Sequence, residues 1–465
     1  MSSVATPYLV SAIVSTYKGE RFIAACLQDL LRQTLGERLE IVVVDSASPQ
    51  KEAAVVRRFQ DAHPNIVYVR TEERETLYAA WNRGIRMARG KYITNANTDD
   101  RLRPDAYARM SRALEEDPSV ALVYGDMLIT PFENQTFERH FRTGYCRMPD
   151  YTPDIMLNAC HMGPQPMWRK SLHEDIGGFD PSFRSAGDYE FWCRIATRFA
   201  MKHLPIFTGL YLQNIAGIVN NNASLSITET ESVKKKYSSL LPAPQTPVNL
   251  ANGRQYAASK LEPGRFANIC LAVSGSSRAA TATLDSLFSL TVFPHTLTVI
   301  GNNCPTETIA YLSDLKQEGI IHHLMLPMHP LSVGQAANLG WQAEPDAAYY
   351  VLVQEGVVME SEDWLSAMVW NIDKLTNVAV LCYGFGSVPL SVKTVKRRRI
   401  CLPSDAKPET GCLLVPRRTW TRIGPWLETE SMDAMIAEYG ERLQKKAGKI
   451  AWMDPETIRV TKPAA

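Results

Sequence analysis

The sequence lacks the patterns that mark extracellular or membrane-spanning proteins. Its nine cysteines occur singly, with no C-x-x-C pair and no dense spacing, which favours a reduced compartment where thiols serve as small core residues. No apolar run approaches the length that spans a bilayer, and residues Met1–Thr6 do not form a signal sequence. We therefore expect a cytoplasmic protein with no transmembrane segment, whose contacts with the inner face of the membrane are at most peripheral.

An excess of charge of one sign is also missing. The formal net charge is +1 over 465 residues, so no overall field favours nucleic acid or a charged membrane surface as a partner. The composition, with 45% hydrophobic and 21% charged residues, is ordinary for a globular protein. A chain of this length can form two or three domains, each with its own core.

Glycine-rich phosphate-binding loops are absent as well. Neither G-x-G-x-x-G nor G-x-x-x-x-G-K-[ST] follows the first strand-like segment, which argues against a dinucleotide-binding fold and against a P-loop. Phosphate groups of a ligand would therefore have to be held by another device.

What the sequence does contain is a regular alternation of strand-like and helix-like segments. The first apolar run, residues 8–16, is rich in β-branched residues and shows no polar alternation, as in a parallel strand buried on both faces. Similar segments follow, with strands over 39–44 and 65–70 and helices over 21–35, 51–63 and 77–89. This alternation predicts an α/β fold built on an open, mostly parallel, doubly wound sheet.

Polar residues follow three strands of this pattern. Thr16-Tyr17 ends the first strand, Asp45-Ser46 ends the second, and Asn97–Asp100 follows the strand that begins at Tyr92. Because ligands of open α/β sheets bind at the carboxyl ends of the strands, we expect these loops to converge on one site.

The acidic turn within Tyr92–Asp105 is the most informative of these loops. β-favouring residues run into small polar residues and then into the adjacent acids Asp99 and Asp100, with Pro104 placed to open a helix. Two neighbouring carboxylates repel each other unless a cation lies between them. Oxygen ligands of this kind suit Mg²⁺ or Mn²⁺, with phosphate oxygens filling the remaining positions. A solvated turn with a helix cap is the alternative.

A further acid, Asp188, stands at the start of a predicted helix. Phe191, Trp192 and Ile195 recur at helical spacing after it. Asp188 can therefore be a functional carboxylate or only a helix cap, where acids are favoured. His161 can likewise contact a ligand or serve as a hydrogen-bonded structural histidine, and Trp192 can stack on a ligand or fill the core.

Five short motifs occur in a fixed order along the first half of the chain. They are IVSTY at residues 13–17, VVVD at 42–45, NANTDDR at 95–101, IGGFD at 176–180 and GDYEFWCR at 187–194. In this order and spacing, segment 7–227 resembles the family-2 glycosyltransferases of the GT-A fold. The resemblance implies an enzyme that moves a sugar, with inversion, from a nucleotide diphosphate donor of the UDP, dTDP or GDP type to a hydroxyl acceptor. It also implies Mg²⁺ or Mn²⁺ as cofactor and a glycan or glycolipid acceptor in cell-surface glycan or polysaccharide biosynthesis.

Matching the family's motifs residue by residue gives a candidate site. By this resemblance the residues are Thr16, Tyr17, Asp45, Asn97 and Thr98 for the nucleotide, Asp99 and Asp100 for the metal, and Asp188 as the catalytic base.

The sequence departs from the family pattern at three of these motifs. The usual first acid of the metal motif is Asn97, which shifts the ligand role to Asp99 and Asp100. Ser15 stands where the family has a proline after the first strand. Gly187 replaces the glutamate that often precedes the catalytic acid.

The second half of the chain repeats landmarks of the first. Ala337–Gly340 matches Trp81–Gly84, and the strand-like and helix-like segments return after a proline-bearing stretch. We therefore predict a glycosyltransferase domain over 1–240, a linker over 241–265 and a second, degenerate GT-A-like domain over 266–465.

The chemistry of this second copy is changed. A gapless match of residues 350–358 to residues 92–100 places Val357 and Val358 at the metal positions. The same match places Glu355 opposite position 97, where it could still bind a cation. Valines cannot ligate a metal ion, so we expect the second domain to support the first or to hold the acceptor.

Other interpretations compete with this one. The chain could be a non-catalytic scaffold that binds a carbohydrate or a partner, or a nucleotidyltransferase, although only Lys18 could grip phosphate after the first strand. Asp433 could take the place of Asp188 and give the second domain an activity of its own. The basic run 393–399 is a solvated loop or meets an anionic acceptor or lipid surface.

Overall fold

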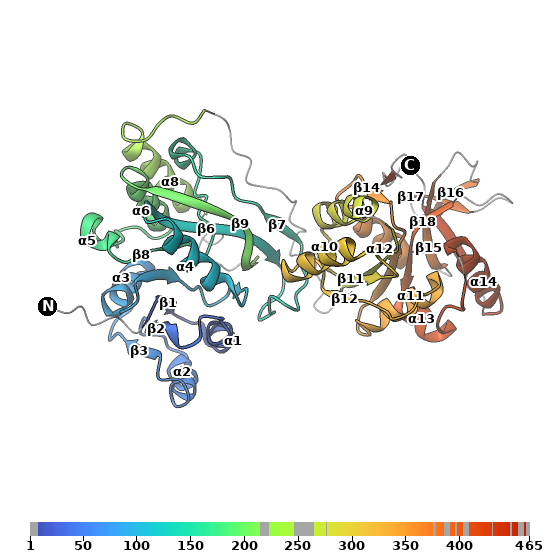
Figure 1. The fold of residues 1–465 in the computed structure, drawn as a ribbon, viewed down its shortest axis with the longest axis horizontal. Helices are drawn as coiled ribbons and strands as arrows, with labels where there is room; N and C mark the ends of the chain where they lie inside the picture. Colours follow the sequence, from blue (N-terminus) through green and yellow to red (C-terminus); the bar gives the residue numbers. More distant parts are fainter. Residues whose placement is uncertain are drawn as a thin grey trace. The chain divides into compact units, whose positions relative to one another are not determined.

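The computed structural model describes most of the chain in two compact units (Figure 1). The first unit comprises residues 1–138 and 145–252, and the second comprises residues 139–144 and 253–465. The described residues are 8–213, 223–245, 265–275, 277–374, 378–385, 391–395, 398–402, 409–429, 431–446, 449–453 and 460–461.

The first unit begins with the predicted α/β alternation, which the structure confirms. Its first four strands are parallel and lie in the order β3-β2-β1-β4. Their bounds are Val10–Thr16 for β1, Leu39–Asp45 for β2, Ile66–Arg70 for β3 and Tyr92–Asn95 for β4. The helices between them are α1 (Glu20–Leu31), α2 (Glu52–Gln60) and α3 (Leu77–Met87), and a 3₁₀ turn (Gly36–Arg38) precedes β2.

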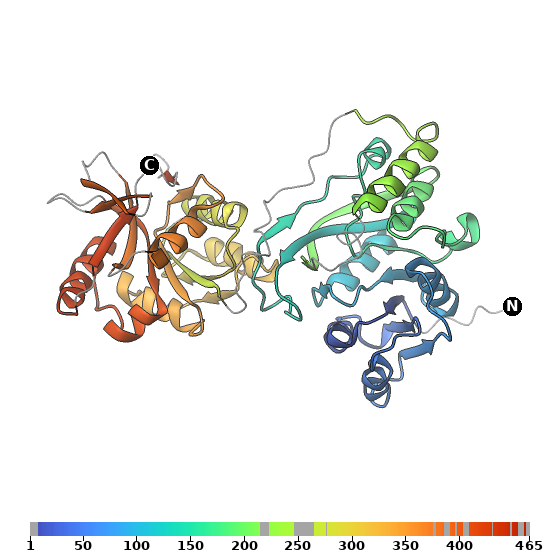
Figure 2. The same ribbon diagram turned by 180° about the vertical axis from the view of Figure 1, so that it is seen from behind.

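The rest of the first sheet is mixed. β8 (Met167–Arg169) is antiparallel to β4, β6 (Val120–Thr130) is antiparallel to β8, and β9 (Ala200–Leu212) is parallel to β6. β5 (Arg101–Leu102) pairs with β9, and β7 (Gly144–Cys146) pairs with β6. The described helices that follow are α4 (Ala106–Glu116), the 3₁₀ turn Pro153–Leu157, α5 (Leu172–Ile176), α6 (Gly187–Ala196) and α8 (Ala223–Tyr237). Helices α6 and α8 lie side by side (Figure 2).

Side chains of the central strand alternate between two cores. Val10, Ala12 and Val14 of β1 are fully buried in the cluster that includes α1 and α4. Ile13 instead belongs to the cluster that contains Trp81 of α3. Because successive side chains of a strand point to opposite faces, this partition is what a sheet with helices on both faces requires.

The second unit contains its own sheet, in the order β12-β11-β10-β13-β18-β15-β19-β17-β16. The strands are β10 (Ala267–Val273), β11 (His295–Gly301), β12 (His323–Met325), β13 (Tyr349–Val353), β14 (Val358–Met359), β15 (Val378–Phe385), β16 (Ser391–Val395), β17 (Arg398–Leu402), β18 (Glu409–Pro416), β19 (Lys449–Met453) and β20 (Val460–Thr461). The helices are α9 (Ser277–Leu290), α10 (Thr306–Gln317), α11 (Val333–Gln342), α12 (Trp364–Lys374), α13 (Arg417–Ile423) and α14 (Met432–Gln444).

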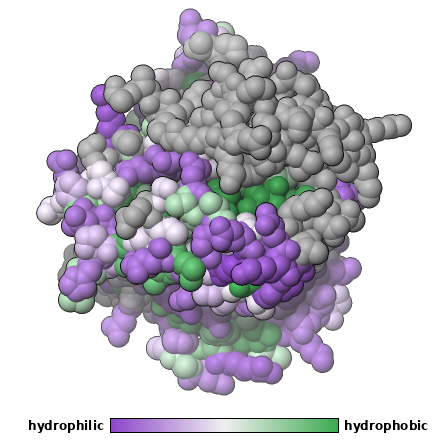
Figure 3. Space-filling model, turned by 90° about the vertical axis from the view of Figure 1, so that its right-hand side faces the viewer, coloured by the Kyte–Doolittle hydropathy of each residue, from purple (hydrophilic) through white to green (hydrophobic). Residues whose placement is uncertain are grey.

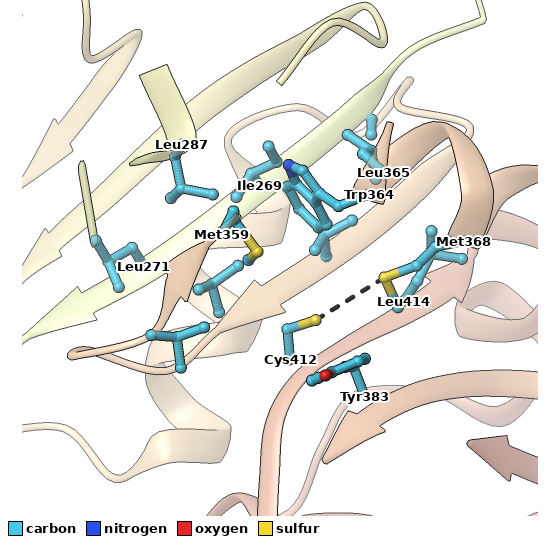
Figure 4. Packing of buried hydrophobic residues seen from close by; sticks show 14 of the residues in the cluster. Ile269, Leu271, Leu287, Met359, Trp364, Leu365, Met368, Tyr383, Cys412 and Leu414 are labelled. Carbon is cyan, nitrogen blue, oxygen red and sulfur yellow. Dashed lines mark hydrogen bonds between the residues drawn. The ribbon is translucent and has the colours of Figure 1, made fainter. Parts of the chain in front are cut away.

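The core of this unit joins helix α12 to the sheet. Trp364 and Met368 of α12 are fully buried among strand residues (Figure 4). The thiol of Cys412 on β18 donates to Met368 Sδ at 3.8 Å. Cys412 is one of eight free cysteines among the described residues. On the face shown in Figure 3, the described side chains are largely hydrophilic, with hydrophobic ones in small groups between them.

The second sheet repeats the topology of the first. Strands β12-β11-β10-β13-β18-β15-β19 correspond in order to β3-β2-β1-β4-β8-β6-β9. The directions agree as well, because the pairs around β10 and β11 are parallel, the pairs of β18 are antiparallel, and β15 is parallel to β19. The two units are therefore copies of one α/β architecture.

The strand register corrects the gapless match of the two copies by one residue. Tyr92 pairs with Val10 at the start of β1, and Tyr349 pairs with Ala267 at the start of β10. Tyr349, and not Tyr350, is thus the counterpart of Tyr92. The sequence match was wrong because adjacent tyrosines and valines look alike in letters, whereas hydrogen bonding to the first strand fixes the register.

The corrected register changes the comparison at the acidic turn. The residues opposite Asn97, Thr98, Asp99 and Asp100 are Gln354, Glu355, Gly356 and Val357 respectively. The short strands after the turns, β5 and β14, begin at equivalent positions in this register. Only one valine therefore replaces an acid, and the other acid is replaced by glycine.

The same asparagine clamp stabilises both units. In the first, Asn82 of α3 donates to Phe179 O at 2.7 Å and accepts from Phe179 N at 2.8 Å. In the second, Asn338 of α11 does the same with Trp426, at 2.9 Å in both bonds. Each clamp satisfies both backbone groups of an aromatic residue in the loop after α5 or α13.

Residues 139–144 belong to the second unit although the chain on either side belongs to the first. Arg142 forms a β-bridge with His295 at the start of β11. The ring of Phe141 lies 4.2 Å from that of Phe266, and the ring of His140 lies 4.7 Å from that of His322. No sequence pattern predicted this insertion, because a short segment carries no periodicity that names its distant partners.

The basic run 393–399 does not form a loop throughout. Residues up to Val395 lie on β16 and residues from Arg398 lie on β17, which pair as an antiparallel hairpin. Residues 396 and 397 lie outside the described part of the chain. The predicted linker also falls mostly on residues that the structure does not describe, 246–264. Among the described helices, none is long and apolar enough to cross a membrane.

Replacement of the clamp asparagine by alanine should destabilise the unit that contains it. Asn82→Ala leaves the amide and carbonyl of Phe179 without partners, which costs about 1–3 kcal/mol in the free energy of unfolding. Asn338→Ala should have a similar effect in the second unit. Urea unfolding followed by tryptophan fluorescence measures both, and losses below about 0.5 kcal/mol, the range of a neutral surface substitution, would contradict the clamp's role.

Candidate active site

The carboxyl ends of β1, β2 and β4 meet at one edge of the first sheet, as the sequence predicted. Ser46 N donates to Thr16 O at 3.0 Å, and Ala96 N donates to Ile13 O at 2.9 Å. These backbone bonds join the loop after β2 and the turn after β4 to β1. The structure therefore brings Thr16, Asp45 and the acidic turn to one edge.

Asp45 is fully buried at the end of β2 and is held by three donors. Its Oδ1 accepts from Ser48 N at 2.8 Å. Its Oδ2 accepts from Tyr68 at 2.7 Å and from Arg70 at 2.6 Å. A carboxylate offers about four lone-pair positions, so these three donors leave one position of Asp45 unused.

Two buried polar atoms at the end of β1 have no partner among the described residues. Thr16 Oγ1 is one of them, and its side chain is 3% exposed. The other is Glu52 Oε2, whose companion Oε1 accepts from Gly19 N at 2.7 Å and from Ser48 Oγ at 2.6 Å. Buried polar atoms without partners are rare in folded proteins and indicate a place where a ligand or water completes the bonding.

The loops at this edge are conformationally strained. Lys18 and Ala47, which follow β1 and β2, both have positive φ, at 55° and 49°. Non-glycine residues in this region are uncommon and gather at functional sites. Gly19 has no room for a side chain, because a Cβ there would lie 2.6 Å from Thr16 Oγ1.

A cationic side chain lies over the ring of Tyr17. The guanidinium of Arg74, from the loop after β3, lies 4.0 Å from the centre of the ring. The sequence analysis missed Arg74, Arg70 and Glu52, because nothing in their local sequence shows that they lie beside β1 and β2.

The acidic turn holds one buried and one half-buried carboxylate. Asp100 is 4% exposed and accepts from Asn97 Nδ2 at 3.0 Å and from Leu212 N of β9 at 3.3 Å. Burial, together with the neighbouring charge of Asp99, raises the pKa of Asp100 to about 7. A divalent cation beside the pair would remove this repulsion, so the residues present fit such an ion.

The described residues offer few ligands for such a metal ion. Within the described residues, no cluster of three or more histidine, cysteine or acidic side chains could hold a metal ion. Mg²⁺ and Mn²⁺ commonly bind through one or two carboxylates plus substrate phosphates, which suits Asp99 and Asp100.

A buried arginine, Arg101, holds the backbone of the acidic turn. Arg101 is 1% exposed, and its Nη2 donates to Thr98 O at 3.0 Å and to Asn134 Oδ1 at 3.1 Å. Its guanidinium lies 3.8 Å from Asp29 of α1, whose pKa burial raises to about 6. The sequence motif included Arg101 but gave it no role.

Asp188 lies in the first turn of α6, on a different element from the acidic turn. Its Oδ1 accepts from Tyr189 N at 2.8 Å and from Tyr78 Oη at 3.2 Å. Burial raises the pKa of Asp188 above its ordinary value. The position before α6 is Ala186, with no side-chain cap, so Asp188 is not the N-cap residue.

Glu229 of α8 satisfies the backbone in front of Asp188. Its carboxylate accepts from the N–H groups of Arg184, Ser185 and Ala186, at 2.9 to 3.2 Å. A carboxylate at the start of a helix also complements the helix dipole. Glu229 thus fixes the loop that leads into α6, whereas the first-turn N–H of Tyr189 is satisfied by Asp188 itself.

His161 and Trp192 are both structural. His161 is fully buried, and its Nε2 lies 2.7 Å from Ile155 O. Burial lowers its pKa, which favours the neutral ring. Trp192 is 1% exposed and meets Trp168 edge-on at 5.2 Å within an aromatic core.

A buried ionic cluster lies in the first unit between β6 and β9. Asp126 of β6 is fully buried and lies 2.8 Å from His203 Nε2. The other ring nitrogen of His203 lies 2.9 Å from Asp150. Burial opposes the charged ring, but the two carboxylates outweigh it and raise the pKa of His203.

The second unit lacks these site residues at the equivalent positions. Gly301 ends β11 where Asp45 ends β2, and Val273 ends β10 where Thr16 ends β1. Glu355 accepts from Ser274 N at 2.9 Å, so its carboxylate already caps the end of β10.

Asp433 is not the counterpart of Asp188. Arg194 pairs with Glu190 and donates to the carbonyl of Ile176, and Arg442 repeats these contacts with Glu438 and Ile423. Matching the two arginines leads to buried Ile436 at the position of Asp188. Helix α14 begins an extra turn earlier, which is why the acid near its start was misassigned.

Comparison with known proteins agrees with this geometry. Residues 11–176 match the family model described as Glycosyl transferase family 2. This segment includes Asp45, Asp99 and Asp100, whereas Asp188 lies beyond it. The first unit, with its mixed α/β sheet, therefore contains a segment that matches the family-2 glycosyltransferases.

Individual relatives are similar over part of their length. An uncharacterized protein of Mycobacterium tuberculosis is 30% identical over 210 residues, covering 42% of this chain and 65% of that protein. Chondroitin synthase of Escherichia coli is 26% identical over 196 residues, covering 42% of this chain and 28% of the synthase. The chain thus spans less than two thirds of the length of these two relatives. The structure of S. aureus TarS 1–349 in complex with UDP-GlcNAc shares 18% identity at a TM-score of 0.40, over 48% of this chain and 64% of that one.

The His203 cluster predicts a defined pH dependence of stability. Because the pKa of His203 is raised in the folded state, its stabilising contribution is full below the ordinary histidine pKa of about 6.5 and is lost as pH rises through the folded value. The melting temperature of His203→Gln should therefore fall furthest below that of the unchanged protein near pH 5.5, and the gap should narrow toward pH 9. A gap that stays constant between these pH values would show that the ring is not charged.

Proposed function

We propose that the first unit transfers a sugar from a nucleotide diphosphate donor to a hydroxyl group of a glycan or glycolipid acceptor, with inversion and with a divalent cation. The observation that carries this proposal is the acidic turn, where buried Asp100 lies beside Asp99 with its pKa raised to about 7. Such a pair is unfavourable in the folded protein alone, and a cation with a diphosphate supplies the missing charge. The family-2 model covers the same segment.

The nucleotide would lie against the ends of β1 and β2. Asp45 has one lone-pair position left, which can accept the ring N–H of uracil, thymine or guanine. Adenine and cytosine lack such a donor at the corresponding ring nitrogen. Thr16 Oγ1 and the ring of Tyr17 are the adjacent groups for base and ribose, and Asn97 and Thr98 precede the metal pair.

The diphosphate end would lie at the acidic turn. Mg²⁺ or Mn²⁺ held by Asp99, with Asp100 beside it, would act as a Lewis acid toward the leaving diphosphate. Arg101 holds the carbonyl of Thr98 and so fixes the turn in front of the two acids. Asn97 fixes Asp100 through its side-chain amide.

Asp188 would serve as the general base. Burial raises its pKa above the ordinary value, which makes the carboxylate a stronger proton acceptor. The acceptor hydroxyl loses its proton to Asp188 as its oxygen bonds to the anomeric carbon. The bond from that carbon to the diphosphate oxygen breaks on the other side of the sugar, which inverts the configuration.

The second unit is proposed to be non-catalytic. It keeps the topology of the first but has Gly301, Val273, Val357 and Ile436 where the first has its site residues. A scaffold that only binds a carbohydrate would explain these replacements but not the unfavourable acids that the first unit retains. Donor turnover separates the two interpretations.

Asp99→Ala should abolish the metal dependence of donor binding. The substitution removes a metal ligand from a half-buried turn without opening the core, so folding should be retained. Affinity for UDP with Mn²⁺ should fall about tenfold or more, since loss even of outer-shell partners weakens metal sites 10- to 100-fold. Isothermal titration with Mn²⁺ and with EDTA measures this effect.

Glu355→Ala is the matched control in the second unit. It removes the carboxylate at the equivalent turn and should leave donor binding and turnover unchanged. Undiminished, Mn²⁺-dependent UDP binding in Asp99→Ala would reject the metal assignment. Loss of turnover in Glu355→Ala would instead assign chemistry to the second unit.

Asp188→Asn should abolish turnover while donor binding is retained. The amide keeps the size of the side chain and its bond to Tyr189 N but cannot take a proton, so the rate should fall about 10²-fold or more. Release of nucleoside diphosphate from a panel of UDP-, dTDP- and GDP-linked sugars with Mn²⁺ measures the rate. Near-normal release from the best donor would exclude Asp188 as the base.

A further inference from the structure

Tyr78 connects helix α3 to the acid at the start of α6. Its side chain is 1% exposed, and its hydroxyl donates to Asp188 Oδ1 at 3.2 Å. Both this bond and the one from Tyr189 N go to Oδ1. Oδ2 is therefore the oxygen of Asp188 that can accept a proton.

The close approach of Tyr78 explains the glycine at position 187. A Cβ on Gly187 would lie 2.6 Å from Tyr78 Cε2 and 2.7 Å from Cδ2. Carbon atoms that are not bonded do not approach this closely, so any side chain at 187 would displace the ring. The tyrosine ring thus occupies space that an acid before Asp188 would need.

The ring of Tyr78 is itself held in place. It stacks on Phe179 at 6.0 Å and meets Trp81 edge-on at 5.6 Å. Phe179 is in turn fixed by both backbone bonds to Asn82. The hydroxyl therefore reaches Asp188 from a rigid support rather than from a mobile loop.

We infer that Tyr78 is the positioning residue of the general base, holding Asp188 Oδ1 so that Oδ2 faces the acceptor hydroxyl, an inference that rests on the proposed function. In the second unit Ile436 stands at the position of Asp188, and it needs no such donor. The contact therefore accompanies the acid and is not part of the scaffold that the two units share.

The Tyr78 hydroxyl also affects the pKa of Asp188. Burial disfavours the ionised carboxylate, and Glu229 of α8 adds a like charge nearby. The thiol of Cys160 also lies near Asp188, and burial raises the pKa of this thiol, which keeps it neutral. The bonds from Tyr78 and Tyr189 N oppose burial by favouring the charged form. Loss of the Tyr78 hydroxyl should therefore raise the pKa of Asp188 further.

The test is Tyr78→Phe, which keeps the ring and its packing and removes only the hydroxyl. With the best nucleotide sugar of the panel and Mn²⁺, kcat at pH 7 should fall about tenfold or more, as expected for a misplaced catalytic group. The acidic limb of the kcat profile should move to higher pH, and KM for the donor should stay the same. Gly187→Ala should move the same limb in the same direction, because it displaces the ring.

Tyr92→Phe is the matched control. It also removes a buried tyrosine hydroxyl that donates to a carboxylate, Glu115, but away from Asp188. Its kcat and pH profile should match those of the unchanged enzyme, and an equal loss in this variant would overturn the inference. If Tyr78→Phe has a normal kcat and an unshifted acidic limb while Asp188→Asn loses turnover, the positioning role of Tyr78 is wrong and the base assignment stands. Near-normal turnover in Asp188→Asn would overturn the base assignment and the role of Tyr78 with it.

Discussion

The parallel pairing of β1 with β2 and β4 is the constraint on which the rest of the first unit depends. It places the ends of three strands at one edge and fixes which residue of each strand arrives there. A shift of one residue would turn every side chain of a strand to the opposite face and disperse the site. Thr16, Asp45 and the acidic turn share a site because they follow strands held in one register.

The two adjacent acids in the turn after β4 are electrostatically unfavourable. Burial of Asp100 next to Asp99 works against ionisation, as the raised pKa of Asp100 indicates. In the second unit a glycine and a valine stand at these two positions, and the same topology persists. The fold therefore does not require the acids. Their presence in only one copy is the strongest argument within the molecule that they serve chemistry.

Comparison of the two units separates structural residues from chemical ones without any other sequence. The asparagine clamps at Asn82 and Asn338 occur in both copies, as does a tyrosine hydroxyl at the start of β4 or β13 bonded to a helix carboxylate. Such shared contacts maintain helix–loop and helix–sheet geometry. Among the described residues, the bond from Tyr78 to Asp188 occurs in the first copy and has no equivalent in the second, which supports the positioning role proposed for Tyr78.

Local pattern was sufficient for the elements and for much of the candidate site. Periodicity identified strands β1 to β4 and helices α1 to α3 of the first unit, because burial on both faces of a parallel sheet leaves long apolar runs. The acidic turn and Asp188 were recognisable because they follow a strand or open a helix in short motifs. The repeat of the fold could be predicted too, but its register was wrong by one residue until hydrogen bonding fixed it.

The tertiary structure alone decided the contacts between residues distant in sequence. Arg74 lies over Tyr17, Glu229 accepts hydrogen bonds from the backbone before Asp188, and residues 139–144 belong to the second unit. Each depends on where helices and loops meet after folding, and a single sequence records no pairing of this kind. The sequence by itself determined which chemical groups are available at the strand ends. The packed structure determined which of them are buried, oriented and charged, because those properties arise from neighbours that folding brings together.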